Sequence, residues 1–257
     1  MLKVKNINVV IMAAGKGTRL GGLVPKPLSE ISNGVSILVK LLKTTLKLKP
    51  LKLIVVVGHK ASDVIANIEN YYPNSNNIDF VFQEKLNGTL GAAESGMSQI
   101  VNNDDLILIL PADNAWFLKS TTLQSLVTNH LEQKAVVSTL LTHEFNDRLH
   151  KVEYLVSNDR IKSIRTRTQH LKTNRKYFAG TGILCIEKKY LEDNKKFIEP
   201  LPSGEYTVSR IIEVALNQKK VVGCVPVSTS EILTINTPSD LNRLRLLAKA
   251  SLNTAKH

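Results

Sequence analysis

The chain has 257 residues, 43% of them hydrophobic, and a formal net charge of +12. This length suits one α/β domain with a full hydrophobic core. No apolar run reaches the length of a membrane span, and the N-terminal apolar stretch is too short for a signal peptide, so we expect a cytoplasmic protein. The aromatic content of 5% makes nucleic-acid binding by base stacking a weak alternative, and the basic charge alone fits any anionic partner.

Apolar periodicity in the first half predicts alternating strands and helices. The expected strands are 7–13, 52–57, 78–83, 106–110 and 135–141, and the expected helices are 35–48, 61–70, 88–101 and 118–131. The strands are continuous apolar runs, as in parallel strands covered on both faces. We therefore predict an α/β protein with a doubly wound, mostly parallel (mixed) sheet and ligands at the carboxyl ends of the strands.

The second half is less regular. We expect a hairpin from 150–157 and 160–166, strands at 177–186 and 219–227, and a helix at 208–217. A last helix has Thr237 as N-cap, Pro238 at its first position and Asp240 three residues after the cap. Its Leu241, Leu244 and Leu247 should pack inward, and its tail should fray from about Ser251. Cys185 and Cys224 lie in apolar segments and are expected to be buried, reduced thiols.

The segment after the first strand has the composition of a phosphate-binding loop. Small residues let backbone N–H groups approach a ligand, and they stand at Ala13, Ala14, Gly15 and Gly17. Cations around the same turn are Lys16, Arg19 and Lys26. A P-loop is excluded because Val10 stands where its first glycine should be, and a dinucleotide fingerprint is excluded because Leu20 replaces its third glycine.

What remains is Ala-Ala-Gly-x-Gly-Thr-Arg-Leu followed by Pro-Lys-Pro-Leu, which resembles the sugar-phosphate nucleotidyltransferases. The resemblance implies a GT-A-like fold, a single domain over 1–257, a nucleotide-binding half at 1–142 and an acceptor half with the C-terminal helix at 143–250. It also implies an enzyme that joins a nucleoside triphosphate to a sugar 1-phosphate and releases pyrophosphate. Arg19 and Lys26 would be catalytic, on the triphosphate and the α-phosphate. Other substrate-binding residues of the loop would be Ala13, Ala14, Gly15, Lys16, Gly17 and Thr18.

Asp113 follows an apolar strand and is the candidate metal ligand. A carboxylate at this position faces the phosphate loop. Mg²⁺ needs only one or two protein ligands beside phosphate and water. The alternative role of Asp113 is to cap the N-terminus of the following helix. Asp104 and Asp105, at the other end of that strand, are expected in a turn. The family resemblance adds Asn236 as a second Mg²⁺ ligand.

Gln83, Gly88 and Thr89 form the candidate base-binding segment. A glutamine amide can pair with the edge of uracil or thymine, and it can flip to suit cytosine. The spacing resembles the base-reading loop of N-acetylglucosamine-1-phosphate uridylyltransferases, which implies a pyrimidine triphosphate, with UTP first. The resemblance continues through Gly204-Glu205-Tyr206-Thr207-Val208 and covers most of residues 7–250.

The acceptor side departs from that family, whose sugar-reading positions hold Leu149-His150, Thr166 or Arg165, and Gly180 in this chain. Gly180 remains a candidate substrate-binding residue, and the acceptor is not identified. The basic run 160–176 is either a solvated face or an anion-binding surface. Alternatives to the sugar nucleotidyltransferase are a cytidylyltransferase for a non-sugar phosphate such as phosphocholine, and a non-catalytic nucleotide-binding regulatory homologue. The sequence does not specify the oligomeric state.

Overall fold

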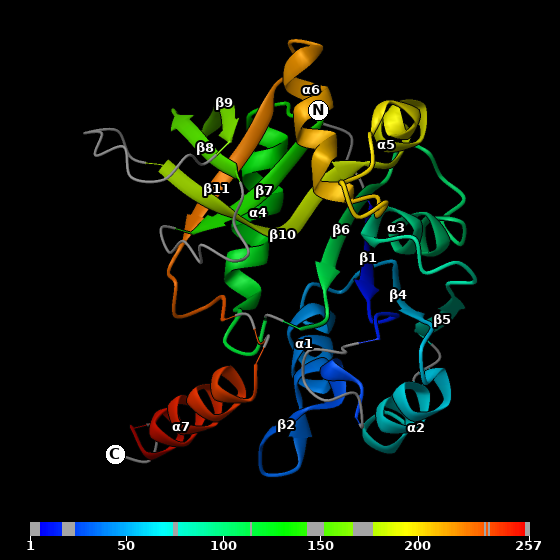
Figure 1. The fold of residues 1–257 in the computed structure, drawn as a ribbon, viewed down its shortest axis with the longest axis vertical. Coiled ribbons are helices and arrows are strands. Elements are labelled where there is room, and N and C mark those ends of the chain that lie inside the picture. The colour runs from blue at the N-terminus through cyan, green and yellow to red at the C-terminus, as the bar shows by residue number, and fades with distance from the viewer. Residues whose placement is uncertain are drawn as a thin grey trace.

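The structure is a computed structural model that describes residues 6–16, 24–73, 77–113, 115–142, 152–166, 177–233, 235 and 237–254. Within these residues nine strands form one mixed sheet (Figure 1). They are β1 (Ile7–Met12), β4 (Lys52–Val57), β5 (Ile78–Phe82), β6 (Leu106–Pro111), β7 (Val137–Thr142), β8 (Val152–Ser157), β9 (Arg160–Thr166), β10 (Tyr177–Glu187) and β11 (Val222–Val227). Their order is β5-β4-β1-β6-β10-β7-β11-β9-β8.

The strands that carry the predicted loops are parallel neighbours. Strand β1 pairs with β4 on one side and β6 on the other, and β4 pairs with β5. Their carboxyl ends therefore meet at one edge of the sheet. Strand β10, from the second half of the chain, runs antiparallel between β6 and β7. Residues from both halves of the chain thus belong to one sheet.

Helices cover both faces of the sheet. They are α1 (Ile37–Leu46), α2 (Ala61–Tyr71), α3 (Thr89–Met97), α4 (Ser120–Glu132), α5 (Lys188–Asn194), α6 (Ile211–Asn217) and α7 (Pro238–Thr254). Short 3₁₀ turns are η2 (Lys26–Leu28), η3 (Lys195–Phe197) and η4 (Val208–Arg210), and a small hairpin is formed by β2 (Glu30–Ser32) and β3 (Val35–Ser36).

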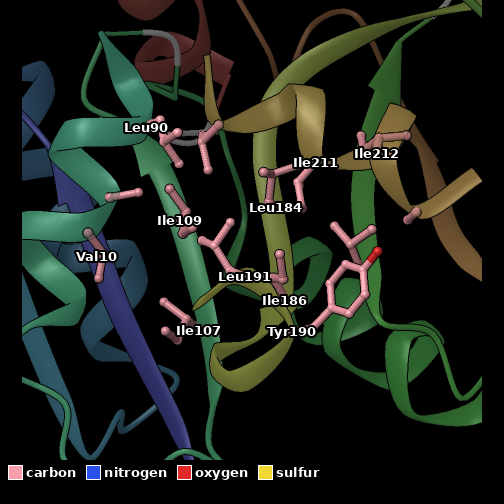
Figure 2. Packing of buried hydrophobic residues seen from close by; sticks show 14 of the residues in the cluster. Val10, Leu90, Ile107, Ile109, Leu184, Ile186, Tyr190, Leu191, Ile211 and Ile212 are labelled. Atoms are coloured by element: carbon pink, nitrogen blue, oxygen red, sulfur yellow. The ribbon is translucent and has the colours of Figure 1, made fainter. Parts of the chain in front are cut away.

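Successive residues of each central strand belong to different hydrophobic clusters. In β1, Val10 belongs to the cluster that includes residues of α3, α5 and α6 on one face, which Figure 2 shows. Val9 and Ile11 pack with α1, α2 and α4 on the other face. The doubly wound α/β class predicted from the apolar runs is therefore confirmed, and the sheet is mixed because β10 inserts antiparallel.

The C-terminal helix lies outside this sandwich, beside the β2–β3 hairpin (Figure 1). Its start is as predicted: Thr237 Oγ1 accepts from the Asp240 N–H at 3.2 Å, and an Asp240 carboxylate oxygen accepts from the Thr237 N–H at 2.8 Å. Leu244 is buried, but Leu247 is 41% exposed and Ala248 takes the inward position. The prediction for Leu247 was wrong, because the inward stripe follows a spacing of four residues there.

Several predicted boundaries also change. Helix α1 starts at Ile37, because the Ser36 hydroxyl caps it by accepting from the Val39 N–H at 3.2 Å. The helix expected over 88–101 ends at Met97, and the strand expected from 219 starts at Val222. Helix α7 continues past Ser251 to Thr254. No described helix is long and apolar enough to cross a bilayer.

Asp105 is not a simple turn residue. It is buried at the amino end of β6, and its carboxylate accepts from the side-chain amides of Asn6, Asn8 and Asn102 at 2.8–3.2 Å. The cluster joins the amino ends of β1 and β6, at the edge of the sheet opposite the predicted loops. It holds the two strands in register and takes no part in the candidate site.

Candidate functional site

The predicted phosphate loop leaves β1 at the carboxyl edge of the sheet. Ala13 and Ala14 are buried, and Gly15 and Lys16 are exposed. The Ala13 N–H donates to the Val56 carbonyl at 2.8 Å, and the Ala14 carbonyl accepts from the His59 N–H at 3.1 Å. A Cβ atom added to Gly15 would meet no atom of the described residues within 4 Å. Gly17, Thr18 and Arg19 lie outside the described residues.

Lys26 and Asp113 meet although they are far apart in the sequence. The Lys26 ammonium donates to Asp113 Oδ2 at 2.6 Å, with side chains that are 12% and 31% exposed. Lys26 begins the 3₁₀ turn η2, where the flanking prolines restrict the backbone. Asp113 follows β6, whose end is fixed by the bond from the Ala112 N–H to the Met12 carbonyl at 3.2 Å. Two residues predicted for catalysis and metal binding are thus in direct contact.

Asp113 offers a partly exposed carboxylate at this edge of the sheet. No group of three or more His, Cys, Asp or Glu residues that could hold a metal occurs in the described part of the chain. Mg²⁺ binds through few protein oxygens and many phosphate and water oxygens. A single carboxylate at this position therefore has the donor chemistry that the predicted ion would need. Asn236 lies outside the described residues.

Gln83 is buried at the carboxyl end of β5, where its amide is built into its own loop. Its Nε2 lies 3.0 Å from the Lys85 carbonyl, 3.2 Å from the Gly88 carbonyl and 3.3 Å from Asn87 Oδ1. Carbonyl oxygens only accept, so they fix which end of the amide faces the loop. The sequence allowed the Gln83 amide to rotate by half a turn to suit cytosine. The Lys85 and Gly88 carbonyls oppose that rotation, and Oε1 is left to act as an acceptor.

Gly88 and Thr89 hold another segment of the chain in place. Gly88 has φ +109°, and a Cβ there would lie 2.3 Å from the Tyr206 carbonyl oxygen. The Thr89 hydroxyl accepts from the Val208 N–H at 3.0 Å, and the Tyr206 N–H donates to the Asn87 carbonyl at 2.9 Å. The loop that follows Gln83 is thus docked on residues 206–208, which the sequence motif alone did not relate to it.

Gly180 lies in an irregular part of β10. It pairs with Leu141 of β7, and the register shifts between Gly180 and Leu184. A Cβ at Gly182 would lie 3.3 Å from Pro111 at the end of β6. The bulge therefore sits beside the strand end that leads to Asp113, as bulges near binding sites often do.

The two arginines in the described part of the basic run contact neighbouring side chains, whereas Lys162 is exposed. Arg165 contacts Glu153 Oε2 of the hairpin partner strand through Nε and Nη2, both at 2.6 Å. Arg160 Nε donates to Gln133 Oε1. Residues 167–176 lie outside the described residues, as do Leu149 and His150.

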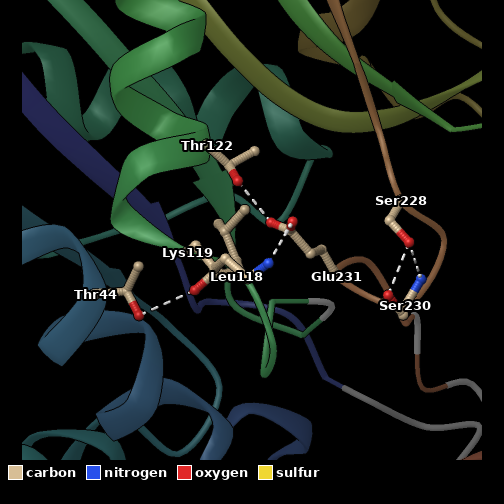
Figure 3. Close-up of polar contacts among 7 residues, drawn as sticks. All are labelled: Thr44, Leu118, Lys119, Thr122, Ser228, Ser230 and Glu231. Carbon is tan, nitrogen blue, oxygen red and sulfur yellow. Dashed lines mark hydrogen bonds and ion pairs between the residues drawn. The ribbon is translucent and has the colours of Figure 1, made fainter.

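Sequence reasoning missed the anchor of the segment between β11 and α7. Glu231, with a side chain only 14% exposed, accepts from the Thr122 hydroxyl at 2.6 Å and contacts the Lys119 ammonium at 3.3 Å (Figure 3). Helix α4 has Lys119 at its N-cap and no side-chain cap of its own. The sequence signal for this contact is that α4 begins without a capping side chain. The free N-terminus of a helix attracts an acceptor or a negative charge from elsewhere in the chain.

The comparison with protein families decides the assignment. The sequence model of the MobA-like NTP transferase domain matches residues 9–181, more than half of the chain. The chain belongs to this family. The matched residues of this NTP transferase domain run from β1 to the bulge of β10 and include Lys26, Gln83 and Asp113. The predicted resemblance to sugar-phosphate nucleotidyltransferases is confirmed.

Curated relatives agree with this assignment. The bifunctional protein GlmU of Aliarcobacter butzleri is 29% identical over 238 residues, which cover 91% of this chain and 51% of that protein. The GlmU of Prochlorococcus marinus is 35% identical over 132 residues, covering 51% of this chain and 28% of that protein. A protein of Acanthamoeba polyphaga mimivirus assigned as a UDP-N-acetylglucosamine pyrophosphorylase is 30% identical over 138 residues, covering 54% and 53%. The chain spans about half or less of the length of these relatives.

Solved structures support the fold. A Bacillus anthracis structure assigned as a glucose-1-phosphate thymidylyltransferase has a TM-score of 0.74 at 20% identity, covering 94% of this chain and 95% of that one. A CMP:2-keto-3-deoxy-manno-octonic acid synthetase complexed with CTP has a TM-score of 0.73 at 16% identity, covering 96% and 100%. At these identities the likeness concerns the fold alone.

Proposed function

We propose that this NTP transferase domain joins a pyrimidine nucleoside triphosphate, with UTP preferred, to a sugar 1-phosphate and releases pyrophosphate. The observation that carries the proposal is the contact of Lys26 with Asp113 at 2.6 Å, at the end of β6 next to the loop after β1. It joins a cation suited to phosphate with a carboxylate suited to Mg²⁺, where an α/β sheet binds its ligands.

The reaction needs little acid–base chemistry. An oxygen of the acceptor phosphate attacks the α-phosphorus, the bond from that phosphorus to the α–β bridging oxygen breaks, and pyrophosphate leaves with the electron pair. The acceptor oxygen is already anionic, so no proton has to be removed. What the protein supplies is alignment of two anions and positive charge to offset their repulsion.

The cations take the main roles in this proposal. Lys26 would move from Asp113 to an α-phosphate oxygen, since both partners are anions within reach of one flexible ammonium. Arg19 would bind the triphosphate, together with the backbone of residues 13–18. Asp113, with Asn236 as the second ligand, would hold Mg²⁺, which when bound adds positive charge beside the phosphates.

The base preference rests on the fixed amide of Gln83. With Nε2 held by the Lys85 and Gly88 carbonyls, Oε1 is left to accept from the base. The N3–H of uracil is a donor at the centre of its pairing edge, whereas N3 of cytosine is an acceptor. When Oε1 faces N3 of the base, uracil or thymine can donate to it and cytosine cannot, which favours UTP or TTP over CTP. We place the reaction in the cytoplasm, where nucleoside triphosphates are available.

A pyrophosphate-release assay tests the proposal. The protein is incubated with Mg²⁺, each of UTP, TTP, CTP and GTP, and a panel of sugar 1-phosphates and phosphocholine. We expect release that needs both a pyrimidine triphosphate and a sugar 1-phosphate, and that falls at least 100-fold in Lys26→Met. The matched control is Lys52→Met, which breaks an ion pair to Asp79 at the amino end of β4. Release that depends on phosphocholine and CTP would contradict the proposal, and no release with any pair would support a non-catalytic homologue.

A further inference from the structure

Tyr154 fills the space above Gly180. A Cβ built on Gly180 would lie 3.1 Å from Tyr154 Cε2 and 3.3 Å from its hydroxyl oxygen. Gly180 is not among the glycines with positive φ, so its backbone would accept any residue. A side chain at position 180 would therefore crowd the tyrosine ring, which would have to shift by a few tenths of an ångström.

This pair lies on the side of Asp113 opposite the base loop. Across the carboxyl edge of the sheet, the order of strands places Gln83 after β5, the phosphate loop after β1, Asp113 after β6 and then the β10 bulge. Gly182 is close to Pro111, and Tyr154 of β8 pairs with Phe178 of β10. If the nucleotide extends from Gln83 to Asp113, the second substrate must lie toward β10.

Tyr154 and Gly180, which we call the β10 wall, offer few chemical groups to a ligand. Tyr154 is 5% exposed, and burial together with the nearby Glu213 raises the pKa of its phenol to about 12. The group is neutral at pH 7 and offers one O–H donor and one acceptor oxygen. The residue opposite Tyr154 in β9 is the apolar Ile164, and the adjacent pair Arg165 and Glu153 is joined at 2.6 Å. The β10 wall thus offers a ligand one aromatic ring and one hydroxyl group.

We propose that Tyr154 determines the acceptor by closing this part of the site, so that the acceptor is a sugar 1-phosphate with free hydroxyls rather than one with an acylamino substituent. The inference rests on the proposed function. A hydroxyl can exchange one hydrogen bond with the phenol. An acylamino group needs more room and adds a donor and an acceptor that would lose their water, and such unpaired groups are rejected strongly.

The test compares glucose 1-phosphate with N-acetylglucosamine 1-phosphate as acceptors for UTP. We expect the native protein to favour glucose 1-phosphate by at least tenfold in kcat/KM. Tyr154→Leu, which shortens the side chain but keeps it apolar, should lower this ratio at least tenfold. Tyr154→Phe keeps the ring and should keep most of the size discrimination. In the Tyr154→Leu background, Gly180→Asn should be tolerated better than in the native chain, as measured by the urea midpoint.

The matched control is Tyr190→Leu. Tyr190 belongs to the same hydrophobic cluster but lies beyond the other end of β10 (Figure 2), so its loss should lower stability and leave the acceptor ratio unchanged. A native preference for N-acetylglucosamine 1-phosphate, or an equal ratio in Tyr154→Leu, would overturn the inference. Absence of release with every acceptor would instead contradict the proposed function itself.

Discussion

Replacing Lys26 by Met should separate catalysis from stability. The ammonium lies 2.6 Å from Asp113, and the side chains are 12% and 31% exposed. Exposed ion pairs contribute up to about 1 kcal/mol, and breaking a buried pair costs about 3–5 kcal/mol. This half-buried pair should lie between them, so we expect Lys26→Met to cost about 1–2 kcal/mol of unfolding free energy. Loss of the cation from the transition state should cost about 3–4 kcal/mol, or roughly 10²–10³-fold in kcat/KM.

Both quantities can be measured on the same protein, by urea unfolding and by pyrophosphate release. Lys52→Met breaks a more exposed pair, at 3.6 Å from Asp79, and should change stability by less than about 0.5 kcal/mol. The double variant Lys26→Met/Asp113→Asn should be destabilised by less than the sum of the single variants, because they share one contact. A kcat/KM of Lys26→Met within threefold of the native value would refute the role of Lys26.

Four further outcomes are expected. Excess EDTA should abolish release and added Mg²⁺ restore it, whereas Asp113→Ala should not recover with Mg²⁺; activity in EDTA would contradict the metal role. Gln83→Leu should reduce the preference for UTP over CTP about tenfold in kcat/KM, and an unchanged ratio would refute the base assignment. Thr237→Ala should lower unfolding free energy by about 1 kcal/mol through loss of the α7 cap. Both cysteines should resist a thiol reagent at pH 8 until urea is added, because they are buried and burial raises the pKa of Cys224 to about 12.

Local sequence patterns predicted the central part of the fold. The apolar run from Lys52 to Val57 is a strand with those bounds, and the Thr237–Asp240 capping box forms as expected. Such features depend on neighbouring residues, which the sequence displays directly. Leu247 was misplaced because the spacing of three residues competes with that of four, and Ala248 gave no signal of being buried.

Contacts between residues that are far apart in the sequence were harder to predict from it. Both Lys26 and Asp113 were predicted for the site, but nothing in their spacing required a direct contact. The bond from Thr122 to Glu231 joins residues 109 positions apart. Tyr154 looked like an ordinary strand residue, because its relation to Gly180 depends on how β8 meets β10. Side-chain packing across strands decides these positions, and periodicity carries no information about it.

The transfer itself can be followed with a labelled acceptor. Glucose 1-phosphate carrying ¹⁸O in its phosphate is incubated with UTP, Mg²⁺ and the protein, and the products are separated and weighed by mass spectrometry. Because the acceptor oxygen attacks the α-phosphorus, the label should appear in a nucleotide sugar, and the pyrophosphate should be unlabelled. Unlabelled UMP with unchanged glucose 1-phosphate would show hydrolysis in place of transfer and contradict the account.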